Sequence, residues 1–214
     1  METLSPSKAA GRASPDAAVS SDVRERLLAT ASSLFYRHGV RSVGVDLVVL
    51  EAGVAKTSLY RHFRTKDDLI AAFLEREDAD FWRGWDRVAD RHTDDPVAEL
   101  EAHLDWIGER VARPNYRGCP QLNVAAEFPE ADHPARKVAA AHKRELRRRL
   151  RGIAERLGAS RPDELAGQFS LLINGAFVSA QVLGPGEATP LLKATARALI
   201  TASNTATPGA THDT

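Results

Sequence analysis

The sequence predicts an all-α protein of about nine helices, with two short helices joined by a tight turn near its N-terminus. Apolar residues recur every three or four positions along most of the chain, as they do on one face of a helix. No segment alternates β-branched and polar residues as a strand would. Of the 214 residues, 43% are hydrophobic, so the chain can bury a core in one or two domains.

A tight turn separates the second predicted helix from the third. Such a turn requires a residue that tolerates positive φ, and Gly53 supplies it, while the small Ala52 lets the two helices approach each other. The first helix carries one apolar stripe and stops at His38. These helices form the first predicted domain, residues 21–66. Their predicted ranges are 22–38, 45–52 and 56–63.

Capping residues, prolines and glycines mark the later helices. Thr65 and Asp68, three residues apart, form the pattern of a capping box, so a helix begins after Thr65. Pro96 and Pro134 suit the first turn of a helix. Together these helices make the second predicted domain, residues 67–202. Their predicted ranges are 66 to about 91, 96 to at least 111, 120–128, 134–157, 160 to before 184, and 189–202.

The two ends of the chain differ from the rest. Residues 1–20 are rich in Ser, Ala, Pro and Gly without apolar periodicity, and residues 203–214 are similar. Such segments bury too little apolar surface to fold, so we expect two disordered tails.

The overall composition bears on the cell compartment. The single cysteine excludes an intramolecular disulfide. The chain shows neither a signal-type segment nor a run of ~18 apolar residues. We therefore expect a cytoplasmic protein that makes no contact with a membrane.

Positive charge is concentrated around the third helix. The 29 basic and 29 acidic residues of the chain cancel, but residues 1–66 hold ten Lys and Arg against six Asp and Glu. On that helix Leu59 and Phe63 share one side, and Thr57 and Arg61 lie nearly opposite. An ordinary solvated basic helix would also explain the charge alone. The turn before the helix favours a DNA-binding surface.

The same residues resemble the signature of the TetR family of bacterial transcriptional regulators. The match consists of Ala52-Gly53-Val54, then Leu59-Tyr60-Arg61-His62-Phe63, and then Lys66. The resemblance covers roughly residues 24–74. Two positions depart from the family pattern. Ala55 stands where a capping Ser or Thr is common, and Thr57 where a Gly or Ala is frequent.

The resemblance implies a function and roles for individual residues. It implies a ligand-responsive regulator, a repressor, which binds a near-palindromic operator in double-stranded DNA as a homodimer. A small-molecule effector of unknown identity would bind among the middle helices, move the fourth helix and weaken operator binding. The resemblance assigns phosphate contacts to Tyr60, His62 and Lys66. Together with the helical geometry it places base contacts at Lys56, Thr57, Ser58 and Arg61.

The last two helices are the predicted dimer interface. In TetR relatives the corresponding pair packs against its symmetry mate, and here both helices carry wide apolar stripes. A purely internal core is the alternative. The interface candidates are Phe169, Ile173, Phe177, Ala180, Leu191 and Leu199.

The fourth to sixth helices are the predicted location of the effector pocket. They are rich in aromatic residues, which line many small-molecule sites as well as ordinary cores. The segment from Tyr116 to Asn123 is similar to a stretch in some TetR regulatory domains. The pocket candidates are Phe81, Trp82, Trp85, Trp106, Cys119, Asn123, Glu127 and Phe128.

Other classes of function have less support in the sequence. The chain has no Gly-rich phosphate loop and no hydrolase or zinc-protease motif, so we expect no enzyme and no cofactor. His133, His142 and Glu127 match no standard zinc spacing, so we expect no metal. Two alternatives stay open. One is a DNA-binding regulator without a ligand, and the other is a redox sensor that uses the thiol of Cys119.

Overall fold

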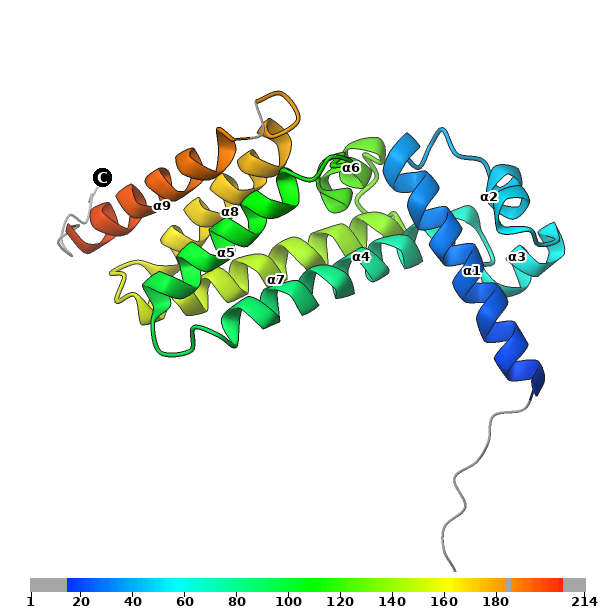
Figure 1. Cartoon of the computed structure of the whole chain (residues 1–214), viewed down its shortest axis with the longest axis horizontal. Coiled ribbons are helices and arrows are strands. Elements are labelled where there is room, and N and C mark those ends of the chain that lie inside the picture. Colours follow the sequence, from blue (N-terminus) through cyan, green and yellow to red (C-terminus); the bar gives the residue numbers. More distant parts are fainter. Residues whose placement is uncertain (1–14, 184–185, 206–214) are drawn as a thin grey trace, which may run out of the picture.

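The protein is an elongated assembly of helices, with a small three-helix part at one end and a larger bundle at the other (Figure 1). The computed structural model describes residues 15–183 and 186–205. In these residues it contains nine helices and no strand. The helices are α1 (Pro15–His38), α2 (Val45–Ala52), α3 (Lys56–His62), α4 (Lys66–Ala89), α5 (Pro96–Val111), α6 (Pro120–Glu127), α7 (Pro134–Arg156), α8 (Pro162–Ser179) and α9 (Ala188–Thr205).

The helix boundaries around the turn follow the capping chemistry. Gly53 ends α2 in the left-handed region, at φ 63° and ψ 39°. Ala55 precedes α3 without any side-chain cap. At the start of α4, Asp68 donates its backbone N–H to the Thr65 hydroxyl, and Thr65 donates its own to the Asp68 carboxylate, both at 3.0 Å. The capping box is therefore confirmed.

The first helix is longer than predicted. It begins at Pro15 instead of residue 22, so the prediction of disorder was wrong for residues 15–20. Ala and Ser tolerate helix well enough to extend it once the following turns are packed. The second tail was predicted from residue 203, but α9 continues to Thr205, so that prediction was wrong for residues 203–205. Residues 1–14 and 206–214 lie outside the described residues.

Two separate hydrophobic cores fill the molecule. The first joins α1, α2 and α3 to the beginning of α4, where Leu69, Ile70 and Phe73 are buried, and it also takes in Val124 of α6 and Ala139 of α7. It thus crosses the boundary predicted between residues 66 and 67. The second core lies among α4, α5, α7, α8 and α9.

The long helix α4 connects the two parts. Its first half belongs to the first core and its second half, with Phe81 and Trp85, to the second. An ion pair between Arg76 of α4 and Glu25 of α1 adds to the connection. No helix in the described part of the chain is long and apolar enough to span a membrane.

Candidate DNA-binding surface and effector cavity

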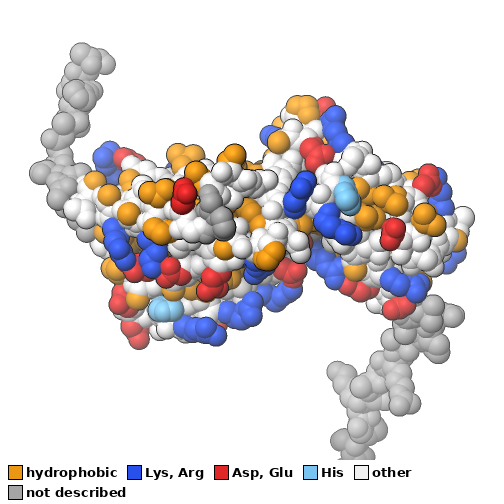
Figure 2. All heavy atoms as spheres, turned by 45° about the horizontal axis from the view of Figure 1, so that its top comes forward, with side chains coloured by type: hydrophobic (Ala, Val, Ile, Leu, Met, Phe, Trp, Pro, Cys, Tyr) orange, Lys and Arg blue, Asp and Glu red, His pale blue; other side chains and the backbone are white. Residues whose placement is uncertain are grey.

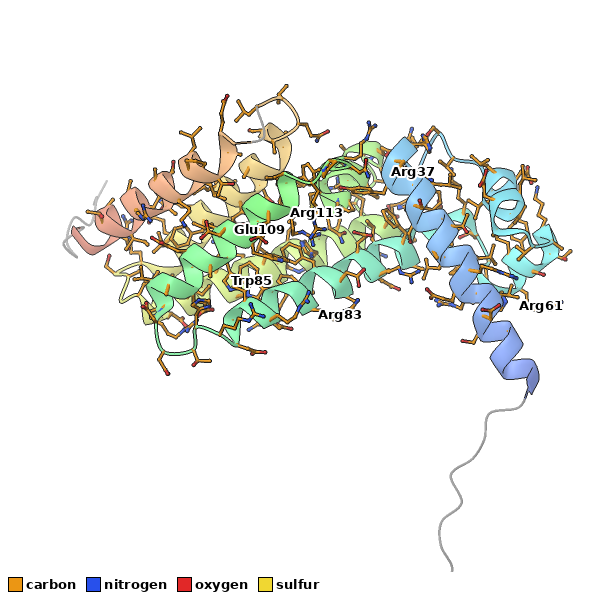
Figure 3. All side chains as sticks on the ribbon, in the orientation of Figure 1. Arg37, Arg61, Arg83, Trp85, Glu109 and Arg113 are labelled. Atoms are coloured by element: carbon orange, nitrogen blue, oxygen red, sulfur yellow. The ribbon has the colours of Figure 1, made fainter. Side chains whose placement is uncertain are left out.

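The helix α3 separates a buried side from an exposed side. Leu59 is fully buried and Phe63 is 3% exposed, so both anchor the helix to the first core. The Arg24 guanidinium lies over the Phe63 ring, 5.1 Å from its centroid. Thr57 and Arg61 are exposed on the other side, where Figure 3 labels Arg61 at the outer end of the small part. This exposed side is free to meet a partner.

Among the residues predicted to contact bases, Lys56 has a partner within the protein. Its ammonium lies 2.7 Å from the Asp46 carboxylate of α2. The hydrogen bond to Asp46 raises the pKa of Lys56. Because both side chains are largely exposed, this ion pair is weak and open to exchange with a phosphate. Ser58 is half-buried and less accessible than Thr57.

The residues predicted to contact phosphates flank the same surface. Tyr60 is 45% exposed, whereas His62 and Lys66 are half-buried. Burial lowers the pKa of Lys66 from its ordinary value of 10.5. The capping box holds the first turn of α4, which orients Lys66 at the start of that helix.

A cavity of about 350 Å³ lies where α1 meets the larger bundle. Its size is within the range of small-molecule sites. Residues of α1, α4, α5, α6, α7, α8 and the segment between α5 and α6 line it. They are Tyr36, Glu77, Asp80, Phe81, Arg110, Arg113, Asn115, Tyr116, Gly118, Cys119, Pro120, Gln121, His142 and Phe177.

Two of the eight predicted pocket residues, Phe81 and Cys119, line this cavity. The three tryptophans do not line it. Trp85 is buried in the second core, where its ring stacks on His103 at 3.7 Å between centroids. Trp106 packs against Phe81, and Trp82 donates its indole N–H to Asp78 at 2.8 Å. Their large apolar surfaces fill the core around the cavity instead of its wall.

Asn123, Glu127 and Phe128 also lie away from this cavity. Asn123 and Glu127 line a separate hollow of about 240 Å³ between α1 and α6. The carboxylate of Glu127 accepts the backbone N–H groups of Val40 at 3.2 Å and Arg41 at 2.9 Å. Phe128 stacks on the His133 ring. Glu127, predicted to lie in the effector pocket, therefore connects α6 to the segment after α1 instead.

Sequence reasoning missed most of the cavity wall. Tyr36 comes from α1, and its hydroxyl donates to the Gly118 carbonyl at 3.2 Å and accepts the Arg117 N–H at 3.0 Å. Arg110 is on α5, where its guanidinium covers Phe81 and Trp106. Nothing in the helical periodicity marks these positions as cavity residues, because both belong to helices with ordinary amphipathic patterns.

Half of the predicted dimer residues belong to the interior of the monomer. Phe169 and Ile173 are fully buried and Phe177 is 3% exposed, so they cannot meet a partner without unfolding. Ala180 and Leu199 are half-buried, and Leu191 is 59% exposed.

The exposed apolar residues lie on the opposite face of α8. Leu171 is 75% exposed and Val178 56%, with the exposed Gly175 between them at helical spacing. Figure 2 shows hydrophobic side chains scattered among charged ones over the face where α8 and α9 lie. This stripe is a surface that a second copy can cover.

Cys119 is buried at the start of α6. Its sulfur lies 3.6 Å from the Lys143 ammonium, which also donates to Asn174 at 2.8 Å. The thiol thus faces both the cavity and a cation.

Comparisons with known proteins agree with this geometry. Residues 27–73 match the family described as "Bacterial regulatory proteins, tetR family". The chain is 33% identical over 128 residues to the HTH-type transcriptional repressor SCO4008 of Streptomyces coelicolor, an alignment that covers 55% of this chain and 62% of that protein. The match therefore spans less than two thirds of this curated relative.

Solved structures extend the similarity to nearly the whole chain. The putative TetR regulator sav143 of Streptomyces avermitilis is 36% identical, with a TM-score of 0.74 over 85% of this chain and 98% of that one. SCO4454, a TetR-family transcriptional regulator of Streptomyces coelicolor, is 27% identical, with a TM-score of 0.81 over 86% and 96%. The helix-turn-helix, the all-α fold and these matches show that the chain belongs to the TetR family of DNA-binding transcriptional regulators.

Proposed function

We propose that this protein is a repressor that binds a near-palindromic operator as a homodimer and releases it when a small molecule enters the cavity. The observation that carries this proposal is Tyr36, a residue of the DNA-binding part whose ring lines the cavity. A ligand there would touch α1 directly. The name of the relative SCO4008, a repressor, supports the direction of regulation.

The exposed side of α3 is the proposed reading surface. Thr57 and Arg61 would contact base edges, with Lys56 and Ser58 at the start of the helix. Tyr60, His62 and Lys66 would hold phosphates, because they lie at the edges of the same surface. A symmetric dimer presents two such helices, so its site is expected to be nearly palindromic. Residues 21–66 are the proposed DNA-binding domain, and residues 67–202 the effector and dimerisation domain.

Three hydrogen-bonded contacts would carry the signal from the cavity. Tyr36 binds the backbone at Arg117 and Gly118. Gln121, in the cavity wall, donates its amide to the Leu74 carbonyl of α4 at 3.1 Å. Glu127, at the end of α6, binds the segment after α1. A ligand that displaces α6 would therefore shift α1 and α4 together, and with them α3.

The proposal is tested in two steps. A binding selection on randomised duplex DNA should return a near-palindromic site at moderate salt. Tyr36→Phe, which keeps the ring and removes the hydroxyl, should then bind both DNA and ligand but show a smaller change in operator affinity when ligand is added. The wild-type protein should show the full change. A protein without preference for any duplex would refute the proposal, and an unaltered response in Tyr36→Phe would refute the pathway through α1.

The position of Cys119 supports a second candidate function. The thiol lines the cavity beside the Lys143 ammonium, where a peroxide can reach it. The thiolate would attack hydrogen peroxide to give a sulfenic acid and hydroxide. If this is the signal, peroxide should release the operator from the wild-type protein and not from Cys119→Ser. Release by peroxide in both proteins, or in neither, would exclude it.

A further inference from the structure

The charged groups in the cavity wall are not all paired. Asp80 forms an ion pair with Arg83, which Figure 3 labels on the outer side of α4. In contrast, the side chains of Arg110 and Arg113 make no hydrogen bond or ion pair with any residue that the structure describes. Glu77 also lacks such a partner among these residues. Glu77 and Arg110 attract each other electrostatically, which leaves two guanidinium groups against one carboxyl group in the wall.

Arg110 is the fixed charge among these groups. Its guanidinium lies 5.4 Å from the Phe81 ring centroid and 5.1 Å from that of Trp106, so two aromatic rings hold it in place. Arginine stays protonated in proteins, even where burial lowers its pKa as it does here. Burial raises the pKa of Glu77, which makes this carboxyl group easier to neutralise. The field in the cavity therefore favours an anion.

The wall also offers a hydrogen-bond acceptor. Gln121 is 3% exposed, and its amide nitrogen must face the Leu74 carbonyl, which can only accept. Its Oε1 is without a partner among the described residues, but this atom is itself buried and faces away from the open space of the cavity. His142 binds Asp78 through Nδ1 at 2.6 Å, and burial lowers the pKa of this histidine, so the ring is neutral and Nε2 is an acceptor.

The remaining wall is aromatic. Phe81 and Phe177 present carbon surfaces, and both tyrosine hydroxyls are already engaged, because Tyr116 donates to the Phe177 carbonyl at 2.8 Å and Tyr36 to Gly118. Such walls bind flat rings by stacking and edge contacts. The volume of about 350 Å³ admits a compact ligand of one or two rings.

We propose that the effector is an aromatic carboxylate of one or two rings that also carries an N–H or O–H donor. Its carboxylate binds Arg110, for which the planar guanidinium is suited, with Arg113 nearby. Its ring lies among Phe81, Tyr116 and Phe177, and its donor meets His142 Nε2. This inference rests on the proposed function, since it names the ligand class of the same cavity.

Matched probes separate the three parts of this recognition. Indole-3-acetate has the ring, the carboxylate and the N–H. Its methyl ester lacks the charge, naphthalene-1-acetate lacks the donor, and tryptamine reverses the charge. Calorimetry on the full chain should show that indole-3-acetate binds at least about tenfold more tightly than the ester or tryptamine, as expected for a charge-assisted bond in a partly buried site. Naphthalene-1-acetate should fall between them.

Variants of the wall assign the effect to Arg110. Arg110→Met should weaken binding of the acid about tenfold or more and leave binding of the ester unchanged. Arg110→Lys should give an intermediate loss of affinity for the acid, because it keeps the charge but lacks the planar guanidinium that makes two parallel hydrogen bonds. Arg87→Met, at an exposed arginine of α4 that does not line the cavity, is the matched control and should bind like the wild type. Melting curves verify that each variant is folded.

Several results would overturn the ligand class. It is wrong if tryptamine binds as tightly as the acid and Glu77→Gln abolishes that binding, or if no probe binds at millimolar concentration to a protein that still binds its operator. A different outcome bears on the proposed function alone. If the acid binds through Arg110 but leaves operator affinity unchanged, the ligand class stands and the regulatory role of the cavity fails.

Discussion

The Glu127 carboxylate accepts the backbone N–H of Arg41 at 2.9 Å and so joins α6 to the segment that leads from α1 into α2. The neighbouring Val40 N–H binds the same carboxylate. Glu127→Ala removes both bonds. We expect it to reduce the factor by which a ligand changes operator affinity, while the affinity for the ligand itself stays the same. The measurement is operator affinity with and without saturating ligand.

Glu130→Ala is the control for this prediction, because Glu130 is an exposed acid shortly after α6. Loss of the two bonds should also lower the free energy of unfolding by about 1 kcal/mol. An unchanged coupling factor in a folded Glu127→Ala protein would show that α6 does not act through this contact.

A contrast between Arg61 and Lys66 tests the assignment of the DNA surface. Arg61→Ala should lose about 1–3 kcal/mol of binding to the selected site and relax the preference at particular base pairs, because Arg61 is placed to read bases. Lys66→Ala should weaken binding to all duplexes alike and lower the salt slope by about one. Selection and salt titration distinguish the two. If the wild type and Arg61→Ala show the same base preference, α3 is not the helix that contacts the bases.

Removal of the acid beside Lys56 should strengthen DNA binding. Asp46→Asn keeps the shape of the side chain, frees the ammonium from its 2.7 Å ion pair and takes one negative charge from the surface. We expect tighter binding to specific and unrelated duplexes, with a salt slope that is steeper by up to about one. Glu51→Gln, also exposed on α2, is the matched control. If the two variants behave alike, the ion pair does not restrain Lys56.

The exposed stripe of α8 should carry the dimer. Val178→Asp places a charge on an exposed apolar surface, so the monomer should fold but fail to associate. Phe177→Asp, one position away, buries an unpaired charge in the second core and should unfold the chain. Val97→Asp on α5 is the control, since Val97 is 47% exposed. Sedimentation at micromolar concentration gives the answer, and a monomeric wild type would contradict the prediction.

Acid should destabilise the protein in part through His103. Burial lowers the pKa of this histidine from 6.5 to about 3. Below about pH 6.5 the unfolded chain therefore binds a proton that the folded chain does not, and the free energy of unfolding falls as the pH falls toward 3. At pH 5 the loss from this group is about 2 kcal/mol.

His103→Phe tests this, because it keeps a ring stacked on Trp85 and cannot bind a proton. Denaturant titrations between pH 7 and pH 5 should show a smaller loss of stability in this variant than in the wild type. His38→Gln, which changes an exposed histidine, should lose as much as the wild type. The same slope in His103→Phe and the wild type would show that His103 takes no part.

The turn and the helix starts could be predicted because their causes are local. Gly53 is required by its own backbone conformation, and Thr65 and Asp68 satisfy each other within one turn. The start of α1 could not be placed in the same way, since Ala and Ser near Pro15 carry no strong signal for or against a helix.

The cavity wall and the burial of the interface candidates depend on tertiary structure, so they are harder to predict from the sequence. A stripe such as Phe169, Ile173 and Phe177 has the same period whether it meets the chain's own core or a partner. The outward stripe on α8 has fewer large apolar residues, Leu171 and Val178, so periodicity alone favours the buried stripe. From the sequence, Arg110 is expected on the surface, whereas in the structure its guanidinium lies over two aromatic rings.

The first core has a consequence for how the two parts of such a regulator can be exchanged. Its buried side chains include Phe73 of α4, Val124 of α6 and Ala139 of α7 as well as those of the first three helices. A fragment that stops at residue 66 would lose these packing partners and expose the surfaces they cover. A hybrid protein that joins this DNA-binding part to the effector part of another regulator must therefore supply matching side chains at these positions. Compatibility of that shared packing, and not the connecting peptide, limits which hybrids can fold.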